Sequence, residues 1–215
     1  MRNIGLKITV VVLTGMFLSG CTFIFQKGRR SDVQKIEELS QQLDDLNQTY
    51  RVLQDRLAQE IQDKEVKLEM LEKGLVITFL TDVLFDSGKA AIKSEAYPAL
   101  DKVARVLKEN VPNLKVGVEG HTDDQPIKYS GWKSNWELSA ARALSVLHYL
   151  ADERGISPER LLASAYGEYR SVASNNTKEG RQLNRRVEVV IIPNVTKTKG
   201  ADTKALSPRH SQKIK

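Results

Sequence analysis

Two oppositely charged residues lie where neighbouring predicted elements could bring them together. Asp123 follows a predicted strand at residues 114–119, and Arg142 lies about two turns into the helix predicted after Ser134. A guanidinium can bind a carboxylate through two hydrogen bonds, whereas an ionised carboxylate accepts hydrogen bonds and so suits an ammonium. The pair could therefore hold a ligand that carries both an ammonium and a carboxylate. The alternative is a purely structural ion pair.

A catalytic or metal site is a competing interpretation of the same region. His121, Asp123 and Asp124, with His148 on the following predicted helix, could imitate a metal-binding or acid–base cluster. The sequence has no H-E-x-x-H motif, no Gly-rich phosphate loop and no nucleophile elbow. One Cys and three His also exclude a disulfide framework and a zinc site built on Cys pairs. We therefore expect no catalytic residues, no metal and no cofactor.

The net charge of +6 over 215 residues would ordinarily suggest a nucleic-acid-binding protein. Residues 1–20 contribute +2 and residues 195–215 contribute +5, which leaves −1 for residues 21–194. A neutral body presents no basic face, so we expect no nucleic-acid partner. Residues 195–215 are predicted to form a disordered basic tail.

The first 30 residues have the pattern of a targeting signal. Two basic residues precede an apolar run at 8–18, which is short for a transmembrane helix. The run leads into Leu18-Ser19-Gly20-Cys21, which resembles the lipobox of bacterial lipoproteins. That resemblance implies a signal peptide at 1–20, lipidation of Cys21 and a lipidated linker at 21–30. Thr22 in place of Asp implies the periplasmic face of the outer membrane. The alternative is an uncleaved signal anchor with an incidental Cys.

Residues 31–73 are predicted to form a coiled-coil helix. Residues 31–72 lack Gly and Pro, and apolar residues recur at spacings of three and four, with one four-residue stutter after Leu57. The seam comprises Ile36, Leu39, Leu43, Leu46, Tyr50, Leu53, Leu57, Ile61, Leu68 and Leu71. It favours a self-associating spacer, a dimer or a trimer. The alternative is a helix that folds back on the globular domain. Gly74 is expected to end the helix.

Residues 75–194 are predicted to form a globular α/β two-layer domain, because strands and helices alternate along this segment. A capping box at Ser134 and Glu137 marks the start of one helix. The predicted elements are strands at 75–80, 114–119, 161–166 and 186–192, a short extended piece at 83–85, helices at 94–110 and 134–154, a helical turn at 157–158 and an irregular connection at 167–183.

Four ordered motifs in this domain carry a resemblance to a known family. They are Phe85-Asp86-Ser87-Gly88, Val118-Glu119-Gly120-His121-Thr122-Asp123, Asn135-x-x-Leu138-Ser139-x-x-Arg142-Ala143 and Asn184-Arg185-Arg186-Val187-Glu188. Together they resemble the OmpA-like C-terminal domain, the peptidoglycan-binding module of outer-membrane protein A and peptidoglycan-associated lipoprotein. The segment after Lys133 also resembles flagellar motor protein B. The family fold is βαβαβ with a further strand.

The resemblance implies peptidoglycan as the ligand and assigns roles to particular residues. Diaminopimelate in the peptidoglycan stem ends in an ammonium and a carboxylate, which Asp123 and Arg142 would bind. The remaining implied site residues are Asp86 and Ser87 in a loop over the ligand, Asn135 as a brace or ligand contact, and Arg185 in the pocket lining. The alternatives are that Asp86 is a turn residue and that Arg185 is a solvent-facing charge on a strand.

Aromatic residues close to this site leave two interpretations open. Trp132 and Trp136 could stack on sugar rings or could fix the loop to the helix. Taken together, the sequence predicts a non-catalytic lipoprotein that tethers the envelope to peptidoglycan. The alternative is a stator-like or secretion-associated component, although residues 8–20 contain no Asp or Glu to carry a proton.

Overall fold

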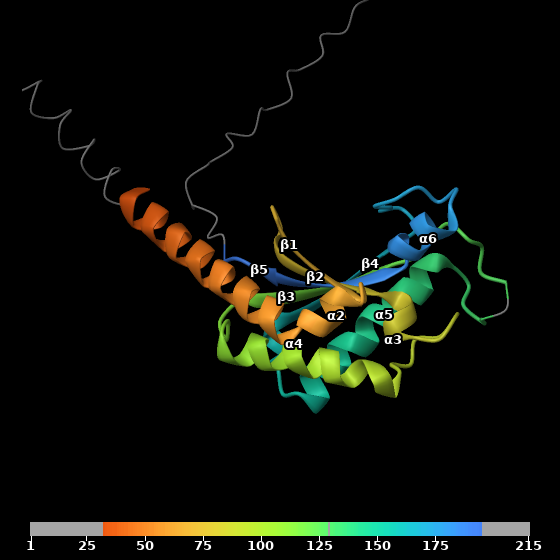
Figure 1. Cartoon of the computed structure of the whole chain (residues 1–215), viewed down its shortest axis with the longest axis horizontal. Coiled ribbons are helices and arrows are strands. Elements are labelled where there is room, and N and C mark those ends of the chain that lie inside the picture. Colours follow the sequence, from red (N-terminus) through yellow and green to blue (C-terminus); the bar gives the residue numbers. More distant parts are fainter. Residues whose placement is uncertain (1–31, 129, 195–215) are drawn as a thin grey trace, which may run out of the picture.

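The computed structural model describes residues 32–128 and 130–194 (Figure 1). The predicted signal peptide at 1–20, Cys21, the linker at 21–30 and the tail at 195–215 lie outside the described residues. Within the described part of the chain, no helix is both long enough and apolar enough to cross a membrane.

A five-stranded mixed sheet forms the centre of the domain, in the order β1-β2-β5-β3-β4. The strands are β1 (Val66–Leu71), β2 (Gly74–Leu80), β3 (Lys115–His121), β4 (Leu161–Gly167) and β5 (Arg186–Ile192). Only β3 and β4 run parallel, and the helix α5 (Asn135–His148) connects them. The predicted α/β two-layer fold is confirmed, and β2 and β5, which are adjacent in the sheet, are more than 100 residues apart in the sequence.

Helices cover one face of the sheet, where the core lies (Figure 1). Helix α4 (Tyr97–Glu109) contributes Leu100, Val103 and Leu107, all fully buried. Alternate residues of the central strands meet them, because successive side chains of a strand point to opposite faces. Those residues are Leu75, Ile77 and Phe79 on β2, Val116 and Val118 on β3, and Val187, Val189 and Ile191 on β5.

The single predicted helix at 31–73 is wrong beyond residue 62. Helix α1 is described from residue 32 to residue 56, α2 (Ala58–Gln62) follows, and Val66–Leu71 is strand β1, paired antiparallel with β2. Apolar and charged residues alternate from Val66 to Met70, a period of two that indicates a strand. Gly74 therefore completes a hairpin, with φ of 124°, and does not end a helix.

The second half of α1 belongs to the domain core. Leu46 and Leu53 in this half, and Leu57 directly after the helix, are at most 1% exposed and pack in the same cluster as the sheet residues. The alternative in which the helix folds back on the globular domain therefore holds for this half. Ile36 and Leu43, in the first half, are 67% and 56% exposed and remain available to a partner.

Two shorter predictions are also wrong. Residues 83–85, expected to be extended, belong largely to the helical turn α3 (Thr81–Leu84). The connection at 167–183 contains the start of helix α6 (Lys178–Asn184), which Thr177 caps by accepting a hydrogen bond from the Gly180 N–H at 3.0 Å. Both errors matter for the site, because α3 and α6 each bring a charged residue to it.

Candidate functional site

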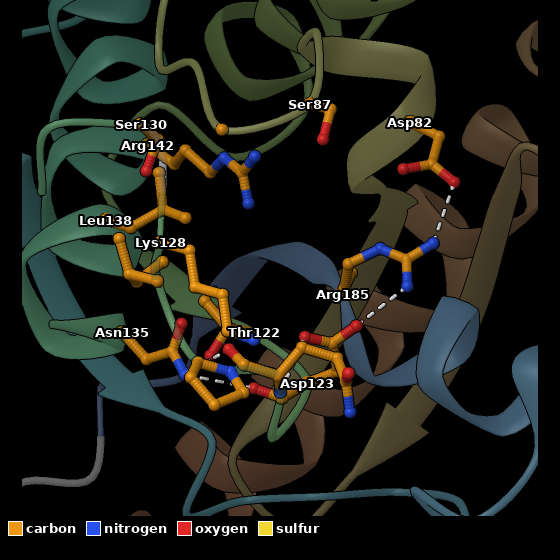
Figure 2. Close-up of a pocket in the computed structure, with 14 residues that line it drawn as sticks. Asp82, Ser87, Thr122, Asp123, Lys128, Ser130, Asn135, Leu138, Arg142 and Arg185 are labelled. Carbon is orange, nitrogen blue, oxygen red and sulfur yellow. Dashed lines mark hydrogen bonds and ion pairs between the residues drawn. The ribbon is translucent and has the colours of Figure 1, made fainter.

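A cavity of about 720 Å³ lies where β3 ends and α5 begins. Its lining comes from α3, the loops after α3 and β3, the buried face of α5, and the junction of α6 with β5 (Figure 2). The charged lining residues are Asp82, Asp123, Lys128, Arg142 and Arg185. Asp123 and Arg142, paired from the sequence, thus face one cavity.

The capping box at the start of α5 positions this wall of the cavity. The Glu137 N–H donates to Ser134 Oγ at 3.3 Å, and the Lys133 N–H donates to Glu137 Oε2 at 2.9 Å. These bonds fix where α5 begins, and therefore where Arg142 sits two turns later. The predicted cap at Ser134 is confirmed, whereas the Glu137 side chain bonds to the N–H of Lys133, one residue before the cap.

The approach of β3 to α5 depends on Gly120. A Cβ atom at this position would lie 2.0 Å from the Ser139 carbonyl oxygen, so no larger residue fits while the backbones keep this separation. The same turn of α5 is held from β4, because the Gly167 N–H donates to Ser139 Oγ at 3.1 Å. Gly120 therefore sets the spacing between the strand that carries Asp123 and the helix that carries Arg142.

Asp123 is a buried carboxylate with a cationic partner from a distant part of the chain. Its side chain is 9% exposed, and its Oδ2 accepts a hydrogen bond from Arg185 Nη1 at 2.8 Å. Arg185 Nη2 donates to Asp82 Oδ2 at 3.1 Å, so the guanidinium bridges two carboxylates. Burial alone would lower the pKa of Arg185, but the hydrogen bonds to the two carboxylates outweigh it and raise the pKa. Arg185 is charged and held in place.

Arg142 is a buried cation with no anionic partner among the described residues. It is 3% exposed, its Nε donates to the Lys89 carbonyl oxygen at 3.0 Å, and its guanidinium lies 5.4 Å from the centre of the Phe85 ring. Burial lowers the pKa of Arg142 to about 10, so the group still carries its charge at neutral pH. Figure 2 shows the guanidinium pointing into the cavity, on the side opposite Asp123.

The other predicted residues take different positions. Asn135 is 8% exposed, and its Nδ2 lies within hydrogen-bonding distance of the Gln125 carbonyl oxygen at 3.1 Å and of Glu168 Oε2 at 2.7 Å, so it braces the loop as well as lining the cavity. Ser87 lines the cavity as expected. Asp86 does not line it; its carboxylate is exposed and pairs with Lys89 at 2.9 Å.

The positions of Trp132 and Trp136 favour a role in holding the loop in place over stacking on sugar rings inside the cavity. Trp132 Nε1 donates to the Gly88 carbonyl oxygen at 2.8 Å, which ties the two loops together. Trp136 stacks on Tyr169 with ring centres 5.2 Å apart. Neither indole lines the cavity.

The histidines do not assemble an acid–base cluster with Asp123. His148 is an exposed residue whose Nδ1 lies 3.0 Å from Asp152 Oδ2. His121 is buried beside Glu119 and Glu188, and neither histidine lines the cavity.

Sequence reasoning missed Asp82 in the lining. The predicted strand at 75–80 and the predicted extended piece at 83–85 leave Asp82 unassigned between them, whereas α3 turns Asp82 towards Arg185. An acidic residue in the first turn of a helix is a usual local signal, but here the helix itself was not predicted.

The sequence is similar to those of several known proteins over the segment that forms the cavity. Residues 84–185 match the OmpA family. Motility protein B of Bacillus subtilis is 41% identical over 131 residues, which cover 61% of this chain and 50% of that protein. Outer membrane porin F of Pseudomonas aeruginosa is 38% identical over 116 residues, covering 54% of this chain and 32% of that protein. The chain thus spans half or less of the length of these two relatives.

A solved structure matches a slightly larger share of this chain and nearly all of its own. The cell wall anchor of the T6SS from Pseudomonas aeruginosa superposes with a TM-score of 0.60 at 35% identity, and the match covers 65% of this chain and 96% of that one. The residues matched by the family, 84–185, contain β3, α5, β4 and every residue that lines the cavity except Asp82. Through this domain, the chain belongs to the OmpA family of peptidoglycan-binding domains.

Proposed function

We propose that the cavity binds the zwitterionic end of diaminopimelate in the peptidoglycan stem, with Asp123 on the ammonium and Arg142 on the carboxylate. The observation that carries this proposal is the unpaired, buried Arg142 guanidinium that faces Asp123 across the cavity. Burying a cation without an anion costs free energy, so a site that keeps one is suited to a ligand that supplies the anion. The carboxylate of diaminopimelate does so.

Arg185 would prepare Asp123 for the ligand. In the free protein it occupies one oxygen of Asp123, while Asp123 Oδ1 accepts a hydrogen bond from the Gln125 N–H at 3.3 Å. An incoming ammonium shares the carboxylate with Arg185, which retains its second bond to Asp82. Asp82 thereby limits the movement of Arg185 when the ligand enters.

Sedimentation of the full chain with isolated peptidoglycan sacculi tests the pocket. Asp123→Asn and Arg142→Gln should each weaken binding by about 10- to 150-fold, because one charge-assisted hydrogen bond contributes roughly 1.5–3 kcal/mol. Asp124→Asn, an exposed residue of the same loop, and Arg105→Gln, an exposed residue of α4, are the matched controls and should bind normally. If the two pocket variants sediment like their controls, the assigned pocket is wrong.

The protein would be attached to the outer membrane by a lipid on Cys21 and would tether the envelope to the wall without catalysis. The motif Leu18-Ser19-Gly20-Cys21 supports this attachment. Metabolic labelling with a palmitate analogue should mark the chain, and Cys21→Ser should lose the label. Separation of inner and outer membranes then shows the destination; recovery of labelled chain in the inner membrane contradicts the outer-membrane proposal.

Self-association would use the first half of α1. Val33, Ile36 and Leu43 are 57%, 67% and 56% exposed, an apolar stripe at helical spacing that the domain core leaves uncovered. Light scattering should show a dimer or trimer that Ile36→Asn dissociates. Val172→Asn, at an exposed apolar residue outside the helix, should leave the oligomer intact.

A second candidate function, a wall anchor within a motility or secretion assembly, is favoured by the similarity to Motility protein B and to the T6SS wall anchor. It uses the same pocket, so sacculus binding does not separate the two. Deleting the gene should cause leakage of periplasmic proteins under the tethering proposal. Loss of motility or secretion with an intact envelope would favour the second.

A further inference from the structure

Three potential metal ligands converge on the sheet, outside the cavity described above. Glu119 on β3 pairs in register with Glu188 on β5, and His121 ends β3 two residues after Glu119. One ligand atom from each of the three lies within 4.8 Å of the others. All three residues are buried, with exposures of 8%, 6% and 2%.

The two carboxylates hold a lysine from the β1–β2 hairpin. Lys73 Nζ lies 2.7 Å from Glu119 Oε2 and 2.5 Å from Glu188 Oε2, while Arg186 Nε donates to Glu188 Oε1 at 2.6 Å. The Lys73 side chain is 35% exposed, against 11% or less for the two glutamates and for Arg186. Lys73 is therefore the member of the cluster that can move into solvent without crossing the core.

His121 points to a ligand that the protein itself does not supply. Neither ring nitrogen has a hydrogen-bond partner among the described residues, although the side chain is 2% exposed. Its Nε2 lies 3.9 Å from both Glu119 Oε2 and Glu188 Oε1, and its ring stacks on Tyr166. A neutral imidazole has one nitrogen lone pair that can bind a metal ion.

We propose that Glu119, His121 and Glu188 form a Zn²⁺ site, which the Lys73 ammonium fills when no metal is bound. Zinc bonds of about 2.0–2.2 Å to histidine nitrogen and carboxylate oxygen place tetrahedral ligands roughly 3.4 Å apart. The 3.9 Å separation of His121 Nε2 from Glu119 Oε2 therefore needs to close by about half an ångström. Glu188 would bind through Oε2, because Arg186 holds its Oε1. Two carboxylates and one imidazole leave the fourth position to water, as in zinc sites with three protein ligands.

The departure of Lys73 limits the change in charge that the metal brings. Zinc brings two positive charges where the ammonium brought one, so the site gains one positive charge, and the two glutamates remain ionised as both groups require. Arg186 keeps its bond to Glu188 Oε1, leaving the oxygen that Lys73 releases for the metal. Lys73 therefore competes directly with Zn²⁺, and removing its charge should strengthen metal binding.

Zn²⁺ titration of the full chain against a chromophoric chelator tests the site. Lys73→Met should tighten Zn²⁺ binding at least tenfold, because it removes the competing cation. Lys67→Met, which removes a neighbouring lysine that pairs with Glu69 on the protein surface, is the matched control and should bind like wild type. His121→Ala should lose the site, whereas His148→Ala, at an exposed histidine, should keep it.

Imidazole ¹⁵N spectra provide a readout that stability does not affect. Addition of Zn²⁺ should move one ring nitrogen of His121 to the metal-bound range in both wild type and Lys73→Met. The proposal is overturned if Lys73→Met binds Zn²⁺ no more tightly than Lys67→Met, or if the His121 ring is unchanged at saturating Zn²⁺. If His121→Ala fails to fold, the comparison of Lys73→Met with Lys67→Met and the ¹⁵N spectrum of His121 still test the zinc site.

Discussion

Substituting Gly120 by alanine should separate the two halves of the peptidoglycan site. The added Cβ would lie 2.0 Å from the Ser139 carbonyl oxygen, whereas real Cβ atoms essentially never approach closer than 3.0 Å, so β3 and α5 must move apart by at least 1.0 Å. Because the clashing atom belongs to the backbone of α5, no side-chain rotation relieves it. Overpacking of this kind costs about 1–3 kcal/mol of folding free energy.

The displacement acts directly on the proposed ligand contacts. Asp123 lies three residues after Gly120, and Arg142 lies three residues after Ser139. A hydrogen bond of about 2.9 Å stretched by a further ångström no longer contributes, so Gly120→Ala should weaken sacculus binding by about tenfold or more. Thermal denaturation should show a fall of roughly 2–12 °C, the range that 1–3 kcal/mol produces in a domain of this size.

Gly117 supplies the matched control on the same strand. A Cβ there would meet Ile192 Cδ1 and Leu162 Cδ1 at 3.4 Å, which is ordinary contact with flexible side chains. Gly117→Ala should therefore melt and sediment close to wild type. If Gly120→Ala behaves like Gly117→Ala in both assays, the spacing between β3 and α5 does not control the site.

Three further outcomes follow from single side chains. Arg142→Met should raise the free energy of unfolding by about 1 kcal/mol in thermal denaturation, because it replaces a buried, unpaired cation, while sacculus binding is lost. Leu53→Ala should cost about 2–5 kcal/mol in urea unfolding, whereas Leu43→Ala should stay within about 0.5 kcal/mol, since the former is fully buried and the latter is 56% exposed. Burial, with a hydrogen bond to Asp101, raises the pKa of Tyr149 to about 12, so its stabilising contribution is complete below about pH 10 and is lost as the pH rises towards 12. The phenolate absorbance difference between wild type and Tyr149→Phe should titrate near pH 12, and a midpoint near 10 would contradict the burial argument.

Local signals account for the parts of the fold that the sequence predicted correctly. Ser134 and Glu137 mark the start of α5 through bonds within one turn, and the apolar stripe of α4 needs no distant partner to be recognised. The strand at Val66–Met70 also had a local signal, an alternation of period two, but a heptad frame that continued from Leu57 concealed it. Interpreting the step after Leu57 as a stutter in the coiled-coil seam is wrong, because this interpretation extends the helical period into strand β1.

Most of the site contacts that the sequence does not predict depend on the register between strands. Arg185 meets Asp82, 103 residues earlier in the chain, because β5 pairs with β2 and the Thr81 N–H donates to the Arg185 carbonyl oxygen at 2.9 Å. The pairing of Glu119 with Glu188 has the same origin in the contact of β3 with β5. Neither register can be derived from single-strand periodicity, which tells which residues share a face and not which residues lie opposite them.

The charge arrangement of the cavity explains why net charge was a poor guide to the ligand. Asp82 and Asp123 balance Arg142 and Arg185, so these four groups sum to zero, as does the diaminopimelate zwitterion; the exposed Lys128 is the remaining charged residue of the lining. Selectivity then rests on the placement of charge: the bridged carboxylate at Asp123 repels a second anion, and the unpaired guanidinium at Arg142 repels a second cation. A ligand with one charge of each sign at the right spacing satisfies both groups. A cation alone leaves Arg142 unpaired in a buried site, and an anion alone leaves Asp123 with Arg185 as its cationic partner. Residues 1–20 and 195–215 carry the net charge of +7, whereas residues 21–194, which include all of the cavity lining, have a net charge of only −1.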